Sequence, residues 1–221
     1  MKRQYFLAAS AAGAAAVNAV PAFAAAPATA SVGMSPKFVF DRAAFEAQLN
    51  RPVRHRQVFA STALEDGQVL RYMENSIAAY ADGFGEGPGT LHAAAVLYGA
   101  SIALACDDTI WTKYNVRAVL GAFPKPEKIS APDAPGNPFA ARVALLASGG
   151  ASFFVCNNAL HGVAAFFAAK NDVLPADSAG NRAVYDDLAA HLWYATLVPA
   201  GVAALNAAQE ARFTLIQATL S

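Results

Sequence analysis

The sequence has little charge and little cysteine. Charged residues make up 14% of its 221 residues and hydrophobic residues 56%, which excludes intrinsic disorder for most of the chain. Sixteen Lys and Arg balance sixteen Asp and Glu, so no basic surplus favours nucleic acid or an anionic membrane surface. Two cysteines are too few for a disulfide scaffold, and no Cys/His spacing fits a structural zinc site. These absences disfavour nucleic-acid binders, zinc modules and multi-pass membrane proteins.

A phosphate-binding glycine fingerprint is also missing. Four glycines lie between residues 83 and 89, but they lack G-x-G-x-x-G spacing and precede an apolar run, where the fingerprint needs a helix. We therefore expect a plain loop here, and no nucleotide or other cofactor. His55, His92 and His191 have no neighbouring ligand partners, so we expect no metal site.

The first 24 residues have the pattern of an export signal. A short basic start (1–4) is followed by a weakly apolar stretch (5–20), and Ala22-Phe23-Ala24 is the small-x-small pattern that a signal peptidase cleaves. A permanent membrane anchor would need about 20 strongly apolar residues, and alanine contributes little burial. We predict a signal peptide over 1–24, no membrane span after cleavage, and a periplasmic protein. Without Lys2 and Arg3, 14 basic residues face 16 acidic ones.

Two export routes fit the N-terminal sequence. The segment 2–7 (KRQYFL) is similar to a twin-arginine signal, with Lys2 in place of the first arginine. The sequence thus favours twin-arginine translocation and leaves the general secretory route open.

Periodicity of the remaining chain predicts one α/β domain. Residues 25–51 form an N-terminal tether or arm, in which 38–49 could be a short amphipathic helix, and the domain covers 52–221 with a mostly helical insertion at about 171–193. Alternating strands and helices imply an open parallel sheet of about five strands with helices on both faces, a three-layer, flavodoxin-like sandwich. The strands expected are 56–60, 91–97, 152–156, 196–198 and 213–216, and the main helices are 68–81, 100–108, 139–148, 159–169 and 199–211.

Cys156 is the strongest candidate for chemistry. It ends a predicted buried strand just where a helix begins, and ligands of open α/β sheets bind at the carboxyl ends of strands. Unpaired N–H groups at a helix N-terminus favour the reactive thiolate, and Asn157 or Asn158 would be the natural N-cap. The alternative is a buried structural cysteine, since cysteine is among the most buried residue types.

Two late motifs carry a family resemblance. The strand-Cys-helix segment at Cys156, followed by 197–205 (LVPAGVAAL) and Gln209, resembles the DsrE/DsrF-like family of sulfur-relay proteins over about residues 55–217. The segment Leu97-Tyr98-Gly99 resembles a family strand that ends in His-Gly, with Tyr98 where histidine is frequent. The resemblance implies that Cys156 accepts a persulfide from a sulfur donor and passes it to an acceptor, without a cofactor. The resemblance also implies a homo-oligomer.

A non-catalytic binding or assembly module remains the alternative function.

Cys106 allows a further possibility, a disulfide with Cys156 in an oxidising compartment. Asp107 and Asp108 near two aromatic residues could line a pocket, or could be solvated at a helix end. His161, five residues beyond Cys156, lies on a different helix face and is expected to be an ordinary core or surface histidine.

Composition independently favours assembly. The small charged fraction is low for the surface of a soluble monomer, and large apolar groups cluster near Cys156 in sequence. Some of this surface would be hidden between copies, unless tight packing of alanine-rich helices alone explains the composition. The residues concerned are Phe166, Phe167, Leu192, Trp193 and Tyr194.

Overall fold

The structure is a computed structural model that describes residues 38–171 and 178–218. The predicted signal peptide, most of the tether and residues 172–177 of the predicted insertion lie outside the described residues. No helix among the described residues is long and apolar enough to cross a membrane.

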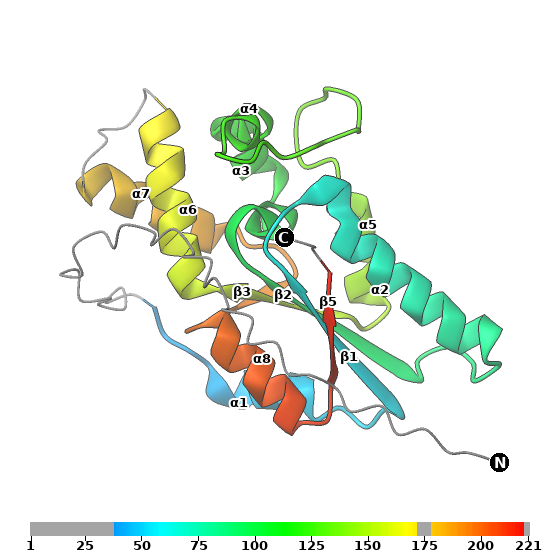
Figure 1. Cartoon of the computed structure of the whole chain (residues 1–221). Helices are drawn as coiled ribbons and strands as arrows, with labels where there is room; N and C mark the ends of the chain where they lie inside the picture. The colour runs from blue at the N-terminus through cyan, green and yellow to red at the C-terminus, as the bar shows by residue number, and fades with distance from the viewer. Residues whose placement is uncertain (1–37, 172–177, 219–221) are drawn as a thin grey trace, which may run out of the picture. The chain divides into compact units, whose positions relative to one another are not determined.

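A five-stranded, all-parallel sheet with the order β4-β3-β2-β1-β5 forms the centre of the domain (Figure 1). The predicted open parallel α/β sheet is confirmed. The second and third strands are almost wholly buried, because an unbroken apolar run suits a strand covered on both faces. The strands are β1 (His55–Ser61), β2 (Leu91–Leu97), β3 (Ser152–Cys156), β4 (Ala195–Val198) and β5 (Thr214–Gln217).

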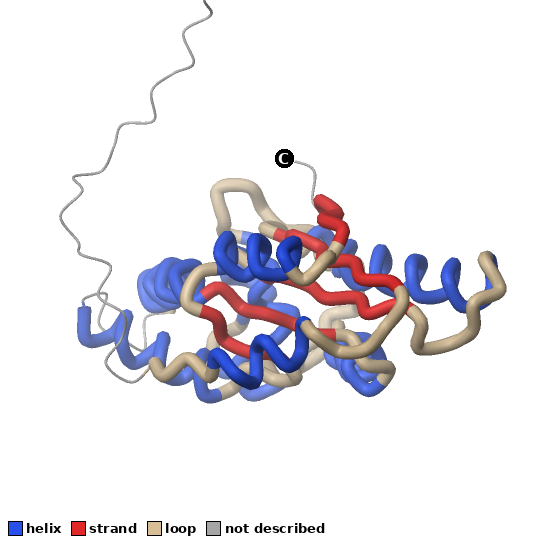
Figure 2. Tube along the Cα trace, turned by 90° about the horizontal axis from the view of Figure 1, so that it is seen from below, coloured by secondary structure: helices blue, strands red, loops and turns tan. Residues whose placement is uncertain are grey.

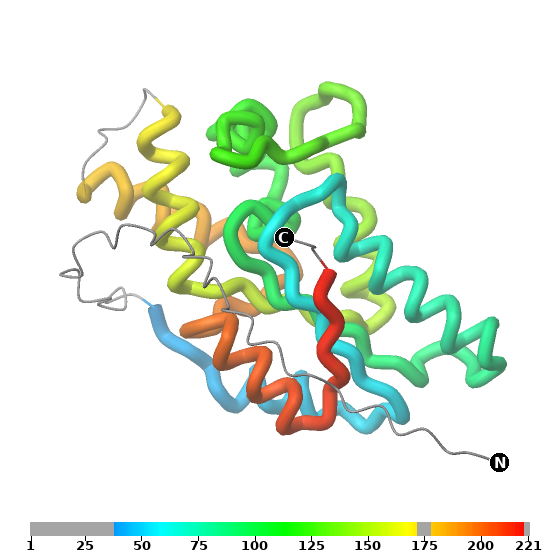
Figure 3. Tube along the Cα trace, viewed as in Figure 1, coloured from blue at the N-terminus to red at the C-terminus, as the bar shows by residue number. Residues whose placement is uncertain are grey.

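Helices cover both faces of the sheet, in unequal numbers (Figures 1 and 2). From β1 to β4 the chain advances in one direction across the sheet, and right-handed crossovers then place the connecting helices on the same face. The return from β4 to β5 runs in the opposite direction, so its helix covers the other face (Figure 3). The helices are α1 (Arg42–Leu49), α2 (Gln68–Ala78), α3 (Asp108–Lys113), α4 (Val116–Gly121), α5 (Ala140–Ser148), α6 (Asn157–Lys170), α7 (Ser178–Ala190) and α8 (Gly201–Glu210).

Each face of the sheet has its own hydrophobic core. The larger core lies beneath α2, α5 and α6, and the smaller one lies beneath α1 and α8. The predicted amphipathic arm is α1, whose Phe45 packs edge-on against Phe154 of β3 with ring centroids 5.0 Å apart. Phe45 and Leu49 are buried, so the arm is part of the second core.

Several helices begin or end at residues other than those predicted from the sequence. The helix predicted over 68–81 is α-helical only to Ala78 and continues as a wide π-helical turn, η2 (Ala79–Gly83). The helix predicted over 100–108 is a tighter 3₁₀ stretch, η3 (Gly99–Ala105), with α3 beginning after it. Pro199 lies just outside α8, because Ala200 is the N-cap of that helix. An irregular segment, rich in proline, connects α4 to α5.

Candidate functional site

Cys156 lies at the junction between β3 and α6. It is the last residue of the strand and the N-cap of the helix, and its Sγ accepts a hydrogen bond from the N–H of Ala159 at 3.4 Å. The prediction that Asn157 or Asn158 caps this helix is therefore wrong. The Cys156 sulfur takes the amide that an asparagine cap would take. The side chain is 5% exposed.

Tyr98 stands beside Cys156 on the neighbouring strand. Leu97 of β2 pairs with Val155 of β3, so the next residue on each strand, Tyr98 and Cys156, lies at the same level. Tyr98 is extended, with φ −128° and ψ 164°. Strand alternation then directs both side chains toward the α8 face, because Leu97 and Val155 belong to the core on the opposite face.

The ring of Tyr98 packs against the first residue of α8. A Cβ on Gly201 would lie 2.7 Å from Cζ and 3.0 Å from Oη of Tyr98, and closer still to Cε1. Glycine is thus the residue that lets the ring approach the helix backbone. The negative charge of a Cys156 thiolate, added to the larger effect of burial, raises the pKa of Tyr98 to about 12.

Hydrogen bonds fix the backbone of Tyr98. Its N–H donates to the carbonyl of Ser61 at 2.9 Å and to Oγ of Ser101 at 3.1 Å. The Ser101 hydroxyl is in turn within 2.6 Å of the Ser61 carbonyl oxygen. The hydroxyl of Tyr98 itself is buried and has no hydrogen-bond partner in the described structure.

A second polar group borders Cys156 on the side of α7. Asn157 is fully buried, and its Oδ1 accepts a hydrogen bond from the hydroxyl of Tyr185 at 2.6 Å. The ring of His161 stacks on Tyr185 with centroids 4.0 Å apart and planes at 4°. Burial, more than the charge of Arg182, lowers the pKa of His161. Nδ2 of Asn157 and Nε2 of His161 are buried and have no hydrogen-bond partner among the described residues.

Cys106 is separate from this group. Both cysteines are free thiols, so the disulfide considered from the sequence is not present in the structure. Cys106 is buried, and its thiol points to the carbonyl of Ile102 at 3.7 Å. Burial raises the pKa of Cys106 to about 12, which keeps it protonated and unreactive at neutral pH.

The acidic pair considered from the sequence has structural roles. Asp107 is the N-cap of α3 and accepts from the N–H of Ile110. Asp108 accepts from the N–H of Asn137 at 2.7 Å. Asp107 thus caps α3, whereas Asp108, the first residue of α3, holds the loop that precedes α5.

Tyr114, one of the two aromatic residues near the acidic pair, lines a pocket of about 410 Å³ together with a different acid. Asp187 of α7 accepts from the amino group of Lys113 and the hydroxyl of Tyr114, each at 2.7 Å, and these residues border that pocket. Sequence reasoning missed Asp187, since only the packing of α7 brings it to this place.

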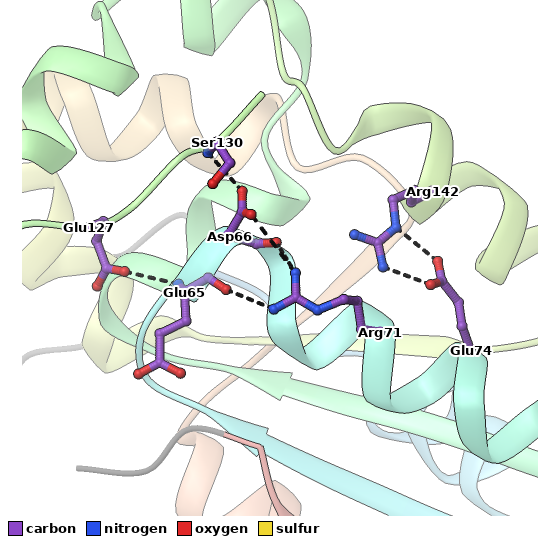
Figure 4. A network of polar contacts seen from close by, with 7 residues as sticks. All are labelled: Glu65, Asp66, Arg71, Glu74, Glu127, Ser130 and Arg142. Atoms are coloured by element: carbon purple, nitrogen blue, oxygen red, sulfur yellow. Dashed lines mark hydrogen bonds and ion pairs between the residues drawn. The ribbon is translucent and has the colours of Figure 1, made fainter. Parts of the chain in front are cut away.

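A strained turn follows β1 at the same carboxyl edge. Glu65, Asp66 and Gly67 have φ values of 41°, 56° and 71°, and left-handed backbone is costly for the first two. The carboxylate of Glu127 accepts from the N–H of Leu64 at 2.9 Å and from the N–H of Glu65 at 3.0 Å. Figure 4 shows the second of these bonds. This carboxylate comes from the loop after α4 and stabilises the turn.

Two further contacts hold the same turn (Figure 4). Asp66 accepts from the N–H of Ser130 at 2.9 Å, and the Asp66 carbonyl accepts from Arg71 at 2.8 Å. The hydrogen bond from Ser130 is the main cause of the lowered pKa of Asp66. The polar groups of this turn are thus paired with one another.

The large apolar residues expected at an assembly surface separate into two sets. Phe167 is buried, and Phe166 stacks on Phe123 with centroids 4.3 Å apart. Trp193 and Tyr194 are 41% and 49% exposed and contact each other. Oligomerisation stays a prediction.

Among the described residues, no group of three or more His, Cys, Asp or Glu side chains could hold a metal ion.

Comparisons with known proteins give one distant likeness. No protein-family model matches the sequence, and no curated protein matches it. A solved structure of a protein of unknown function from Methanobacterium thermoautotrophicum is similar, with 15% identity and a TM-score of 0.42. The match covers 74% of this chain and 98% of that one.

Proposed function

We propose that this chain is an exported, periplasmic carrier of sulfane sulfur that uses Cys156. The observation that carries the proposal is the position of Cys156 at the carboxyl end of a central parallel strand, with its Sγ on the N–H of Ala159. A thiolate formed there is stabilised by the first turn of α6. The resemblance to DsrE/DsrF-like proteins supports the same residue.

The chemistry needs no cofactor. The Cys156 thiolate attacks the outer sulfur of a persulfide or polysulfide donor, an S–S bond forms, and the donor's own S–S bond breaks. The electron pair of that bond leaves on the donor sulfur, which takes up a proton and departs as a thiol from a persulfide, or as a polysulfide one sulfur shorter (finally hydrosulfide) from a polysulfide. An acceptor thiolate then attacks the outer sulfur of the Cys156 persulfide, and Cys156 leaves as a thiolate. Both steps exchange sulfur without net oxidation.

Loading of Cys156 is the direct test. The purified protein is incubated with inorganic polysulfide and its intact mass is measured without reductant. We expect a gain of about 32 Da, one sulfur atom, on Cys156. The Cys106→Ser variant should load like the parent, since Cys106 is buried and protonated. Equal loading of Cys156→Ser would remove Cys156 from the role.

A non-catalytic binding or assembly module is the second candidate, and the 5% exposure of Cys156 favours it. Alkylation of the native protein separates the two. A carrier cysteine reacts with iodoacetamide under native conditions, whereas a structural one reacts only after denaturation. Peptide mapping identifies the modified cysteine, and Cys106 serves as the buried reference within the same chain.

Export and assembly have separate tests. We expect the mature protein in the periplasmic fraction to begin at Ala25, which N-terminal sequencing determines. Light scattering at micromolar concentration measures the mass of that protein, and a value near one chain would contradict the proposed homo-oligomer.

A further inference from the structure

The hydroxyl of Tyr98 is a buried donor with no acceptor. Its oxygen is closed off from solvent and has no hydrogen-bond partner in the described structure, although leaving a buried hydroxyl unpaired is unfavourable. The backbone of the residue is held by Ser61 and Ser101, and its ring lies on Gly201. The backbone is thus held while the hydroxyl is unpaired, which indicates a partner that the hydroxyl reaches only in another state of the site.

The sulfur of Cys156 is the candidate for that partner. Tyr98 and Cys156 lie level on adjacent strands and face the same side, and strands of a sheet are about 4.8 Å apart. The charge of a Cys156 thiolate acts on the Tyr98 hydroxyl. Because the pKa of Tyr98 is raised to about 12, the hydroxyl keeps its proton at neutral pH. It can therefore donate a hydrogen bond to a negatively charged sulfur, and such a bond is stronger than one between neutral groups.

We propose that Tyr98 is a positioning residue that donates a hydrogen bond to the sulfur anion at Cys156. In the unloaded protein the acceptor is the thiolate, which the hydroxyl reaches by a turn of the Tyr98 side chain, because no hydrogen bond joins the two groups in the described structure. In the loaded protein it is the terminal sulfur of the persulfide, which extends about 2 Å beyond Sγ. The second part rests on the proposed function, whereas the first concerns the thiolate alone. Tyr98 would thus favour anionic sulfur over a neutral thiol at this site.

The first measurement is the titration of the Cys156 thiol. The ultraviolet absorbance of the thiolate is followed against pH in a Cys106→Ser background, and the matching Cys156→Ser protein is subtracted to remove all tyrosine signal. We expect Tyr98→Phe to raise the titration midpoint by about one pH unit, which is about ten-fold less thiolate below both midpoints. This readout needs no access of a reagent to the buried sulfur.

Tyr72→Phe is the matched control. Tyr72 lies on α2 and packs on the core of the opposite face, where its hydroxyl accepts from Gln68 at 2.8 Å. We expect its midpoint to equal that of the parent. An unchanged midpoint in Tyr98→Phe would overturn the proposal, because a ring that merely packs loses nothing on becoming phenylalanine.

The second measurement keeps this inference separate from sulfur carriage. Loading with polysulfide is measured by mass in the same variants, together with the rate at which sulfite removes the sulfur. If the parent loads and Tyr98→Phe does not shift the midpoint, the carrier proposal stands and the Tyr98 proposal falls. If the midpoint shifts but the parent does not load, Tyr98 stabilises the thiolate of a protein with another role.

Discussion

The ring of Tyr98 occupies the space that a side chain at position 201 would need, with Cζ 2.7 Å from the position of a Cβ on Gly201. This contact joins the end of β2 to the start of α8, beside Cys156. Sequence alone shows Gly201 only as one residue of a motif. The structure gives it a function, which is to let an aromatic ring lie against the helix backbone.

Gly201→Ala tests this contact. The added methyl must displace the ring or the helix, and we expect a loss of about 1–3 kcal/mol in the free energy of unfolding, measured by chemical denaturation. Gly162→Ala on α6 is the control, because no atom of the described residues lies within 4 Å of its added Cβ. An exposed helical alanine should be neutral or stabilising by up to about 1 kcal/mol. Equal effects at the two positions would show that Tyr98 moves away freely.

His92 makes stability depend on pH. It is buried, its Nε2 lies 3.0 Å from Oγ of Ser152, and burial, with smaller effects of Arg51 and Arg56, lowers its pKa from 6.5 to about 4. Between these values the unfolded chain binds a proton that the folded chain does not. The contribution of His92 to the free energy of unfolding is therefore fully present above about pH 6.5. It is lost as the pH drops toward 4, by up to about 3 kcal/mol.

His92→Gln is the variant for this dependence, since glutamine can still bond Ser152 but does not titrate. Unfolding by urea is measured at several pH values from 7 to 4.5 in both proteins. We expect the difference in stability between parent and variant to change by about 2–3 kcal/mol across this range. Parallel pH profiles would assign the acid sensitivity to other groups.

The sequence predicted the fold because its strands are strong signals. The apolar runs at 91–97 and 152–156 are central strands at those positions, and alternation with helices implied a parallel sheet. Strand order was not predictable, because it follows from long-range pairing that no local pattern encodes. The N-cap of α6 was misassigned, since asparagine is the commoner cap and the sulfur of Cys156 has the same access to the amide of Ala159.

The surroundings of Cys156 were only partly predictable. The sequence indicated Tyr98 only through the family resemblance, because its place level with Cys156 depends on the pairing of β2 with β3. Tyr185 could not be predicted, since its place beside Asn157 depends on how α7 packs on α6. The left-handed conformations of Glu65 and Asp66 were also hidden, because neither residue type requires positive φ.

Glu127 stabilises that left-handed turn from a distant loop. Its carboxylate accepts two backbone N–H groups, which would lose their partner in Glu127→Ala at a cost of about 1–3 kcal/mol. Denaturation by urea measures the loss. We expect Glu127→Gln to retain most of the stability, because its amide oxygen can accept the same bonds, and the exposed neighbour Lys125 to tolerate alanine. A neutral Glu127→Ala would mean that water replaces the carboxylate.

The bond between Tyr185 and Asn157 anchors the first turn of α6 to α7. Asn157 is fully buried, and its Nδ2 already lacks a partner in the part of the chain that the structure describes. Tyr185→Phe therefore leaves the whole carboxamide unpaired there while keeping the ring that stacks on His161. We expect a loss of about 1–3 kcal/mol in the free energy of unfolding and faster hydrogen exchange at the start of α6. Asn157→Leu in the Tyr185→Phe background removes the unpaired amide and should recover part of the loss. If the single variant is as stable as the parent, α7 does not anchor the helix that begins at Cys156.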